Sequence, residues 1–153
     1  WVGGPLAAMT AIYTAYLFAQ AKARDFWQSP LLPAHLLVQA LLAGSATLIL
    51  LNPDGLGVGA VWILKASLAV HLILALGEVS MPHPTAHAAL AARNMTRGAY
   101  AAFYWGGIAL TAGSLLLVGT SDTIGALGAL AGLAGLFLHE HAYVQAGQSV
   151  PLA

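Results

Sequence analysis

The sequence predicts an all-α integral membrane protein, a bundle of about five transmembrane helices, and three observations support this prediction. Of the 153 residues, 59% are hydrophobic and only 7% are charged, whereas a soluble domain carries about 25% charged residues. The apolar residues form continuous runs of about 17 to 22, long enough to cross about 30 Å of hydrocarbon. These runs lack the alternation of apolar and polar residues that marks the strands of a membrane barrel. We therefore expect a lipid bilayer as the main partner.

Composition also excludes several functions. The net charge is zero, so the chain offers no basic surface for nucleic acid. It contains no cysteine, which rules out disulfides and any iron–sulfur cluster or thiolate-bound metal held by this chain alone. A protein of this composition that handles electrons needs a partner to supply the metal centres.

Five apolar runs define the expected spans. They cover Gly4–Gln20, Leu31–Leu51, Val58–Val79, Ala99–Val118 and Thr123–Leu138. Pro5 falls in the first turn of the first span, where its missing N–H is harmless. The turn Asn52-Pro53-Asp54-Gly55 ends the second span. Short connections predict that successive spans are antiparallel neighbours.

The longest connection covers residues 80–98 and has structure of its own. Pro82 and Pro84 stop the third span. The alanine-rich segment Thr85–Arg93 that follows is predicted to form a short helix at the membrane interface.

The basic residues predict the orientation in the membrane. Lys22 and Arg24 follow the first span, Arg93 and Arg97 follow the third, and the opposite loops carry Asp54 and Asp122 but no Lys or Arg. Since cytoplasmic loops carry the excess of Lys and Arg, we expect a multi-pass protein whose Lys22 and Arg93 connections face the cytoplasm. Five spans then place Trp1 outside and the C-terminus in the cytoplasm.

The third span carries three ionisable residues, Lys65, His71 and Glu78. A Lys or Asp at the centre of a transmembrane helix costs about 2.5–3.5 kcal/mol, so such groups turn towards other helices or a wet cavity. His71 and Glu78 lie about 20° apart on one helical face and about 10 Å apart along it. We predict a proton path through Lys65, His71, Glu78 and His35, which Gln39 extends on the second span. A structural salt bridge to another helix is the alternative.

The histidines suggest further sites. His35 and His71 invite a haem hypothesis, but their expected depths differ, and a pair of hydrogen-bonded core histidines is favoured. His83 and His87 stand four residues apart and lack a third ligand, so they make a weak metal site and are expected to be solvated. The sequence His139-Glu140-His141 closes the fifth span and is predicted to be a solvated helix end, with a proton entrance as the alternative.

Two helix faces complete the list of candidate sites. Met9, Thr10 and Tyr13 lie in the first span, where a tyrosine hydroxyl on an apolar helix suits a quinone headgroup that needs hydrogen-bond donors. Ordinary core or interfacial tyrosines are the alternative. In the fifth span, Gly128 and Gly132 form a GxxxG pair, which predicts close packing of two helices.

Two segments carry a resemblance to a known family. The run Arg24–Pro33, RDFWQSPLLP, is followed by an apolar helix with Gly44, and the chain ends with Tyr143–Leu152, YVQAGQSVPL. Both resemble the NrfD/PsrC family, the membrane subunits of polysulfide reductase-like respiratory complexes. The family has two four-helix bundles. The resemblance implies that residues 1–20 are the last helix of an N-terminal bundle, 21–30 a cytoplasmic connection, and 31–153 a C-terminal four-helix bundle.

The resemblance also implies a function. Members of this family exchange electrons between the quinone pool, menaquinone or ubiquinone, and a partner iron–sulfur subunit that contacts further subunits. They typically carry no haem, so we expect neither haem nor an iron–sulfur cluster bound by this chain. The resemblance places Tyr13 near the quinone, and it makes the chain a subunit without catalysis of its own or one that reacts with quinone. Proton conduction is an added expectation. A haem-b membrane anchor, an ion or solute transporter and a purely structural anchor are the alternatives.

Overall fold

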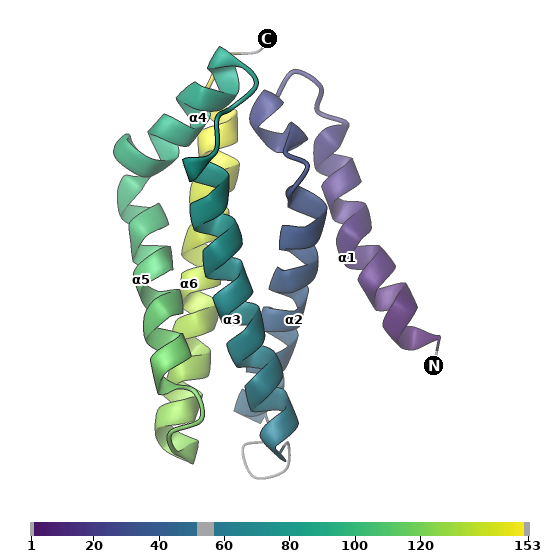
Figure 1. Cartoon of the computed structure of the whole chain (residues 1–153), viewed down its shortest axis with the longest axis vertical. Coiled ribbons are helices and arrows are strands. Elements are labelled where there is room, and N and C mark those ends of the chain that lie inside the picture. Colours follow the sequence, from purple (N-terminus) through teal and green to yellow (C-terminus); the bar gives the residue numbers. More distant parts are fainter. Residues whose placement is uncertain (1, 52–56, 152–153) are drawn as a thin grey trace.

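The computed structural model describes residues 2–51 and 57–151 and is helical almost throughout (Figure 1). The elements follow in the order α1 (Gly3–Ala19), η1 (Asp25–Gln28), α2 (Leu32–Leu51), α3 (Gly57–Ser80), α4 (Ala86–Arg97), α5 (Ala101–Leu117) and α6 (Asp122–Gln148). No strand occurs in the described ranges. The predicted all-α fold and the short helix after the third span are confirmed.

Helices α2, α3, α5 and α6 form an elongated bundle, and α1 leans against α2 at its side (Figure 1). By length and apolar composition α2, α3 and α6 qualify as membrane spans, and α4 with α5 makes a fourth if this pair, bent by 67°, counts as one. α1 has 17 residues, at the lower limit of the about 17–25 that a span needs. The structure therefore supports a multi-pass membrane bundle with three to four clear spans.

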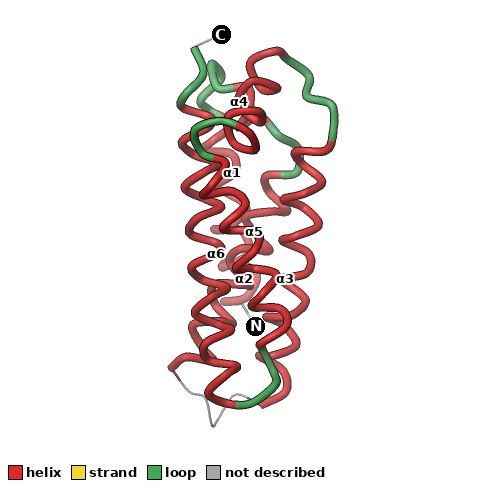
Figure 2. Tube along the Cα trace, turned by 90° about the vertical axis from the view of Figure 1, so that its left-hand side faces the viewer, coloured by secondary structure: helices red, strands yellow, loops and turns green. Residues whose placement is uncertain are grey.

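Four of the five basic residues gather at one end of the bundle. Figure 2 shows the connection between α1 and α2 at the same end as α4, while the turn between α5 and α6 lies at the other. Lys22 and Arg24 lie in this connection and Arg93 and Arg97 in α4. Asp122 begins α6 at the opposite end. The folded molecule therefore has four basic residues at one end of the bundle and the acidic residue Asp122 at the other.

The closest helix packing joins α5 to α6 through small residues. A Cβ added at Gly135 would lie 2.7 Å from Thr111 Oγ1 and 2.9 Å from the carbonyl oxygen of Gly107. One at Gly132 would lie 2.8 Å from Ser114 Oγ. The glycines of α6 therefore let the two backbones approach, as their pattern predicted.

The fifth span was predicted too short. α6 continues to Gln148, ten residues beyond the expected end at Leu138. The predicted end followed from the fall in hydropathy at His139 and Glu140. Both side chains instead turn into the bundle, so the helix continues past them.

The connection between α1 and α2 holds the end of α6. Arg24 donates from Nη1 to the carbonyl oxygens of Gly147, Gln148 and Val150 at 3.2, 3.0 and 2.7 Å. Tyr143 donates its hydroxyl to the carbonyl oxygen of Phe26 at 3.3 Å. The last carbonyls of a helix have no partners within it, and here an arginine from a distant segment satisfies them.

A candidate functional site: the buried histidine cluster

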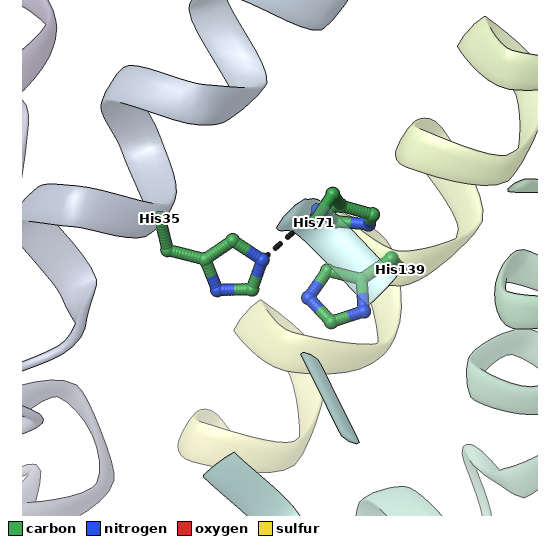
Figure 3. Close-up of side chains that lie close together, drawn as sticks. All are labelled: His35, His71 and His139. Carbon is green, nitrogen blue, oxygen red and sulfur yellow. Dashed lines mark hydrogen bonds between the residues drawn. The ribbon is translucent and has the colours of Figure 1, made fainter. Parts of the chain in front are cut away.

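Three histidines from three helices meet in the middle of the bundle. His35 comes from α2, His71 from α3 and His139 from α6, and their exposed fractions are only 2%, 0% and 1%. His35 Nε2 and His71 Nδ1 form a hydrogen bond of 2.9 Å, drawn as a dashed line in Figure 3. The ring centres lie 4.9, 5.1 and 4.8 Å apart for the pairs 35–71, 35–139 and 71–139. We call these three residues the histidine cluster.

The cluster forms a polar layer between two apolar ones. On one side lie Tyr104, Met95 and Ala142, with the connection between α1 and α2. On the other side lie Leu42, Leu68 and Ala129. Apolar side chains therefore cover the histidines on two sides.

Several polar atoms in and beside the cluster have no partner. Both ring nitrogens of His139, Nε2 of His71 and Oε1 of Glu78 are buried and make no hydrogen bond. Buried polar groups are almost always paired in folded proteins. Four such unpaired atoms lie at the cluster and at Glu78, and others among the described residues lie at Trp27, His83, Thr111 and Ser114.

Two glutamates flank the cluster. Glu78 Oε2 lies 3.9 Å from His35 Nδ1, and both side chains are buried. Glu140 Oε1 accepts a hydrogen bond of 2.6 Å from Gln39 Nε2, one helical turn beyond His35 on α2. No Lys or Arg side chain is buried anywhere in the described residues, so protein cations do not balance these carboxylates.

A cleft leads from the surface to Glu78. Its volume is about 260 Å³, and its walls come from the connection between α1 and α2, the connection between α3 and α4, and the start of α4. The lining includes Asp25, Ser29, His83 and Glu78. Such a space is large enough for several water molecules. Glu78 thus lies between the cleft and the histidine cluster.

Helix geometry explains why α3 supplies two members of this site. His71 and Glu78 are seven residues apart, almost two helical turns, so they share a face. Ala75 lies between them, and its carbonyl oxygen accepts a hydrogen bond of 2.9 Å from the hydroxyl of Tyr104 on α5. A small residue between the two polar ones lets the Tyr104 ring close this side of the site, 5.9 Å from the His139 ring.

The structure brings together three of the four residues of the predicted proton path. His35, His71 and Glu78 lie in one chain of contacts. Lys65 lies elsewhere, beside Gly119 at the turn between α5 and α6. About 9 Å along α3 separates Lys65 from His71.

The distance between His35 and His71 argues against haem ligation by this pair. Two imidazoles that share one iron have their nitrogens about 4 Å apart, two metal–nitrogen bonds. The 2.9 Å between His35 and His71 is a direct hydrogen bond instead. It agrees with the favoured interpretation, a hydrogen-bonded core pair, and removes the objection that the two residues lie at different depths.

His139 is the functional candidate that sequence reasoning missed. It was expected at a solvated helix end, but it is 1% exposed, nine residues before the last residue of α6. A signal for it existed. The buried residues of α6 run through Gly128, Gly132, Gly135, His139, Ala142 and Ala146, spaced by three or four. His139 therefore belongs to the same inward face as the glycines.

The remaining candidates lie outside the cluster. Met9, Thr10 and Tyr13 share the exposed side of α1, where Tyr13 is 59% exposed. The Thr10 hydroxyl donates within its own helix, to the carbonyl oxygen of Leu6. His87 lies 4.0 Å from Asp25 at the surface, and His83 packs against Phe26.

Comparison with known proteins adds one finding. The family model described as polysulfide reductase, NrfD_2, matches residues 1–152. Searches of characterised proteins and of solved structures found no match. The family match covers nearly the whole chain, including the connection that holds α6 and all three members of the histidine cluster.

Proposed function

Since this chain belongs to the NrfD polysulfide reductase family, and thus to the membrane subunits of respiratory reductase complexes, we propose that it exchanges electrons between the quinone pool and a partner iron–sulfur subunit. The family match over residues 1–152 carries this proposal. The quinone is menaquinone or ubiquinone, and it reacts at the membrane subunit while metal centres on the partner receive or supply the electrons. The chain has no cysteine, so clusters ligated by thiolates belong to the partner.

The exposed side of α1 supports a role in quinone binding. Met9, Tyr13 and Tyr16 expose 65%, 59% and 60% of their surfaces. A tyrosine hydroxyl on an apolar helix offers the hydrogen-bond donor that a quinone carbonyl needs, and the apolar neighbours suit the ring. We propose Tyr13 as the donor, with Met9 and Thr10 beside it.

The cleft supports proton uptake as a second role. Reduction of a quinone takes up protons, and the cleft at Glu78 has room for several water molecules. From there the contacts run to His35 at 3.9 Å and on to His71 at 2.9 Å. We propose that protons enter from the cytoplasm through the cleft at Glu78. Lys65 lies about 9 Å along α3 beyond His71, so it would act only at the end of the route farthest from the cleft.

The orientation belongs to the same proposal. The end of the bundle with Lys22, Arg24, Arg93 and Arg97 faces the cytoplasm, since cytoplasmic segments carry the excess of basic residues. The end of α6 is at that side. The C-terminus therefore lies in the cytoplasm of a bacterium, and the membrane is the inner one.

The experiment is purification of the native complex through an affinity tag on this subunit. Mass spectrometry of the purified complex should identify an iron–sulfur protein in stoichiometric amount, and quinone extraction should recover bound quinone. A preparation that contains this subunit alone, active in transport of an ion or solute, would contradict the proposal. As a control, the same purification from a strain with the untagged subunit shows which proteins are contaminants.

A further inference from the structure

We propose that His35, His71 and His139 form a binding site for one divalent transition-metal ion, with Zn²⁺ as its probe. Neutral imidazole is a preferred ligand of zinc and of the neighbouring late transition metals. The site uses one nitrogen from each of α2, α3 and α6, and the three candidate ligand atoms lie within 4.8 Å of one another. The proposal deepens the proposed function, because the ion would sit at the inner end of the proton route.

The spacing of the rings fits this ion. Zinc bound at about 2.0 Å by three imidazoles in tetrahedral geometry holds their nitrogens about 3.3 Å apart and their ring centres about 5 Å apart. The observed ring centres lie 4.8, 4.9 and 5.1 Å apart. The helices therefore already hold the rings at the required separation. The candidate nitrogens, 2.9 Å apart for His35 and His71 and all within 4.8 Å of one another, have to adjust to about 3.3 Å when the ion binds.

The unpaired nitrogens indicate a ligand at the centre of the cluster. His139 is 1% exposed, and neither of its ring nitrogens has a partner. His71 is fully buried, and its Nε2 is also unpaired. A hydrogen bond between His35 and His71 satisfies one nitrogen on each but leaves His139 with nothing. A metal ion at the centre uses one nitrogen of each ring, His139 included (Figure 3).

Glu78 occupies the position of an outer partner. Histidines that bind metals usually give their other ring N–H to a carboxylate, which fixes the ring and its tautomer. Glu78 Oε2 lies 3.9 Å from His35 Nδ1, so His35 can face the cluster with Nε2 while Nδ1 faces Glu78. A dication also supplies the positive charge that the flanking Glu78 and Glu140 lack among the described residues.

The cleft supplies a route for entry. It reaches Glu78 from the surface and is lined by Asp25 and His83 on the way. Carboxylate and imidazole groups along this passage offer a cation ligands on its way to the cluster. With the ion bound, His35 and His71 would hold the metal and would no longer relay protons, so the proposed proton route would then end at Glu78.

The test measures metal content, not turnover. The complete membrane complex is purified, treated with a chelator, loaded with Zn²⁺ and freed of excess, and zinc per complex is measured by mass spectrometry. We expect the wild-type complex to hold one Zn²⁺ more than the His139→Gln complex. His141→Gln is the matched control, because His141 packs against the rings of Phe103 and Phe137 outside the cluster, and it should retain the full zinc content. Glu78→Gln should bind zinc about 10- to 100-fold more weakly.

Equal zinc in the wild-type and His139→Gln complexes would overturn the proposal, and so would zinc lost equally by His141→Gln. If His139→Gln lowers the yield of assembled complex, a measurement on the wild-type complex tests the site instead. Its Tm after chelation should rise when Zn²⁺ is added, because binding to the folded state alone stabilises it, and no rise with no bound zinc refutes the site. None of these measurements involves quinone. A result that refutes the metal site therefore does not refute the proposed electron transfer.

Discussion

At the scale of single residues, the unpaired atoms around the histidine cluster are the strongest physical signal in the molecule. Leaving a buried donor or acceptor without a partner costs about 1–3 kcal/mol. His139 contributes two such atoms, His71 one and Glu78 one. A group that pairs with these atoms would therefore stabilise the bundle, and this favours a ligand at the cluster.

The quinone proposal can be tested at the hydroxyl of Tyr13. Tyr13→Phe removes the proposed donor and keeps the ring, so one hydrogen bond to the quinone carbonyl is lost. Such a bond contributes about 0.5–1.5 kcal/mol, and quinol kcat/KM in the full complex should fall by roughly 2- to 12-fold. Tyr100→Phe, at the start of α5, is the control and should leave the kinetics unchanged. Unchanged kinetics for Tyr13→Phe itself would remove this residue from the quinone site.

Much of the site could be predicted from the sequence, but not its third histidine. Helical periodicity places His71 and Glu78 on one face, and the cost of burying charge turns this face inward. Periodicity within a helix does not say which faces of different helices meet. The hydrogen-bonded pair of His35 and His71 was the favoured prediction, but the arrival of His139 beside it depends on how the faces of α2, α3 and α6 pack. Those relations exist only in three dimensions.

At the scale of helices, the contact between α5 and α6 depends on missing side chains. Gly135→Ala would place a methyl group 2.7 Å from Thr111 Oγ1 and 2.9 Å from the Gly107 carbonyl oxygen. The two backbones have to move apart, and overpacking of this kind costs about 1–3 kcal/mol. We expect a lower Tm for the purified complex. Gly113→Ala, with no atom within 4 Å of the added group, is the control and should not lower it. Equal Tm values for both variants would contradict the packing described here.

The arginine that holds the end of α6 makes a second prediction at this scale. Arg24→Gln removes a positive charge and its hydrogen bonds to the carbonyl oxygens of Gly147, Gln148 and Val150. Hydrogen bonds that involve a charged group contribute about 1.5–3 kcal/mol. Hydrogen exchange at residues 145–150 should therefore become faster, as measured by mass spectrometry.

Lys22→Gln provides the comparison for this variant. Lys22 lies in the same connection and is exposed, so its loss should leave exchange at the end of α6 unchanged. Faster exchange in both variants would mean that net charge, and not the Arg24 contacts, stabilises this end.

The helices themselves were predictable because apolar runs of membrane length leave few alternatives. α2 and α3 differ from their predicted bounds by only one residue at each end or less. The end of α6 was not predictable by hydropathy, because a helix continues as long as its backbone hydrogen bonds do. His139 and Glu140 lower the hydropathy without interrupting those bonds, since the bundle interior accepts their side chains.

At the scale of the whole molecule, the distribution of charge predicts topology. The chain has no cysteine, so single cysteines report their own position without background. Arg93→Cys should react with a membrane-impermeant maleimide only from the cytoplasmic side, and Asp122→Cys only from the outer side. Both positions are exposed at opposite ends of the bundle. The reverse pattern would place the cleft and Glu78 on the outer side and refute proton entry from the cytoplasm.

The family was recognisable from two short segments, and the structure explains their importance. The connection between α1 and α2 and the end of α6 contact each other through Arg24 and through Phe26 with Tyr143. Neither segment identifies a quinone or a partner, because the contacts between them lie within the chain. The function of the whole molecule is therefore inferred from the family match and has to be tested by experiment.

The most direct test of the central claim follows electrons through the complex. Quinol is added to the purified complex, with and without this subunit, and reduction of the partner's iron–sulfur clusters is followed by electron paramagnetic resonance. The account predicts that quinol reduces the clusters only when this subunit is present. Equal reduction in its absence would contradict the proposed electron transfer.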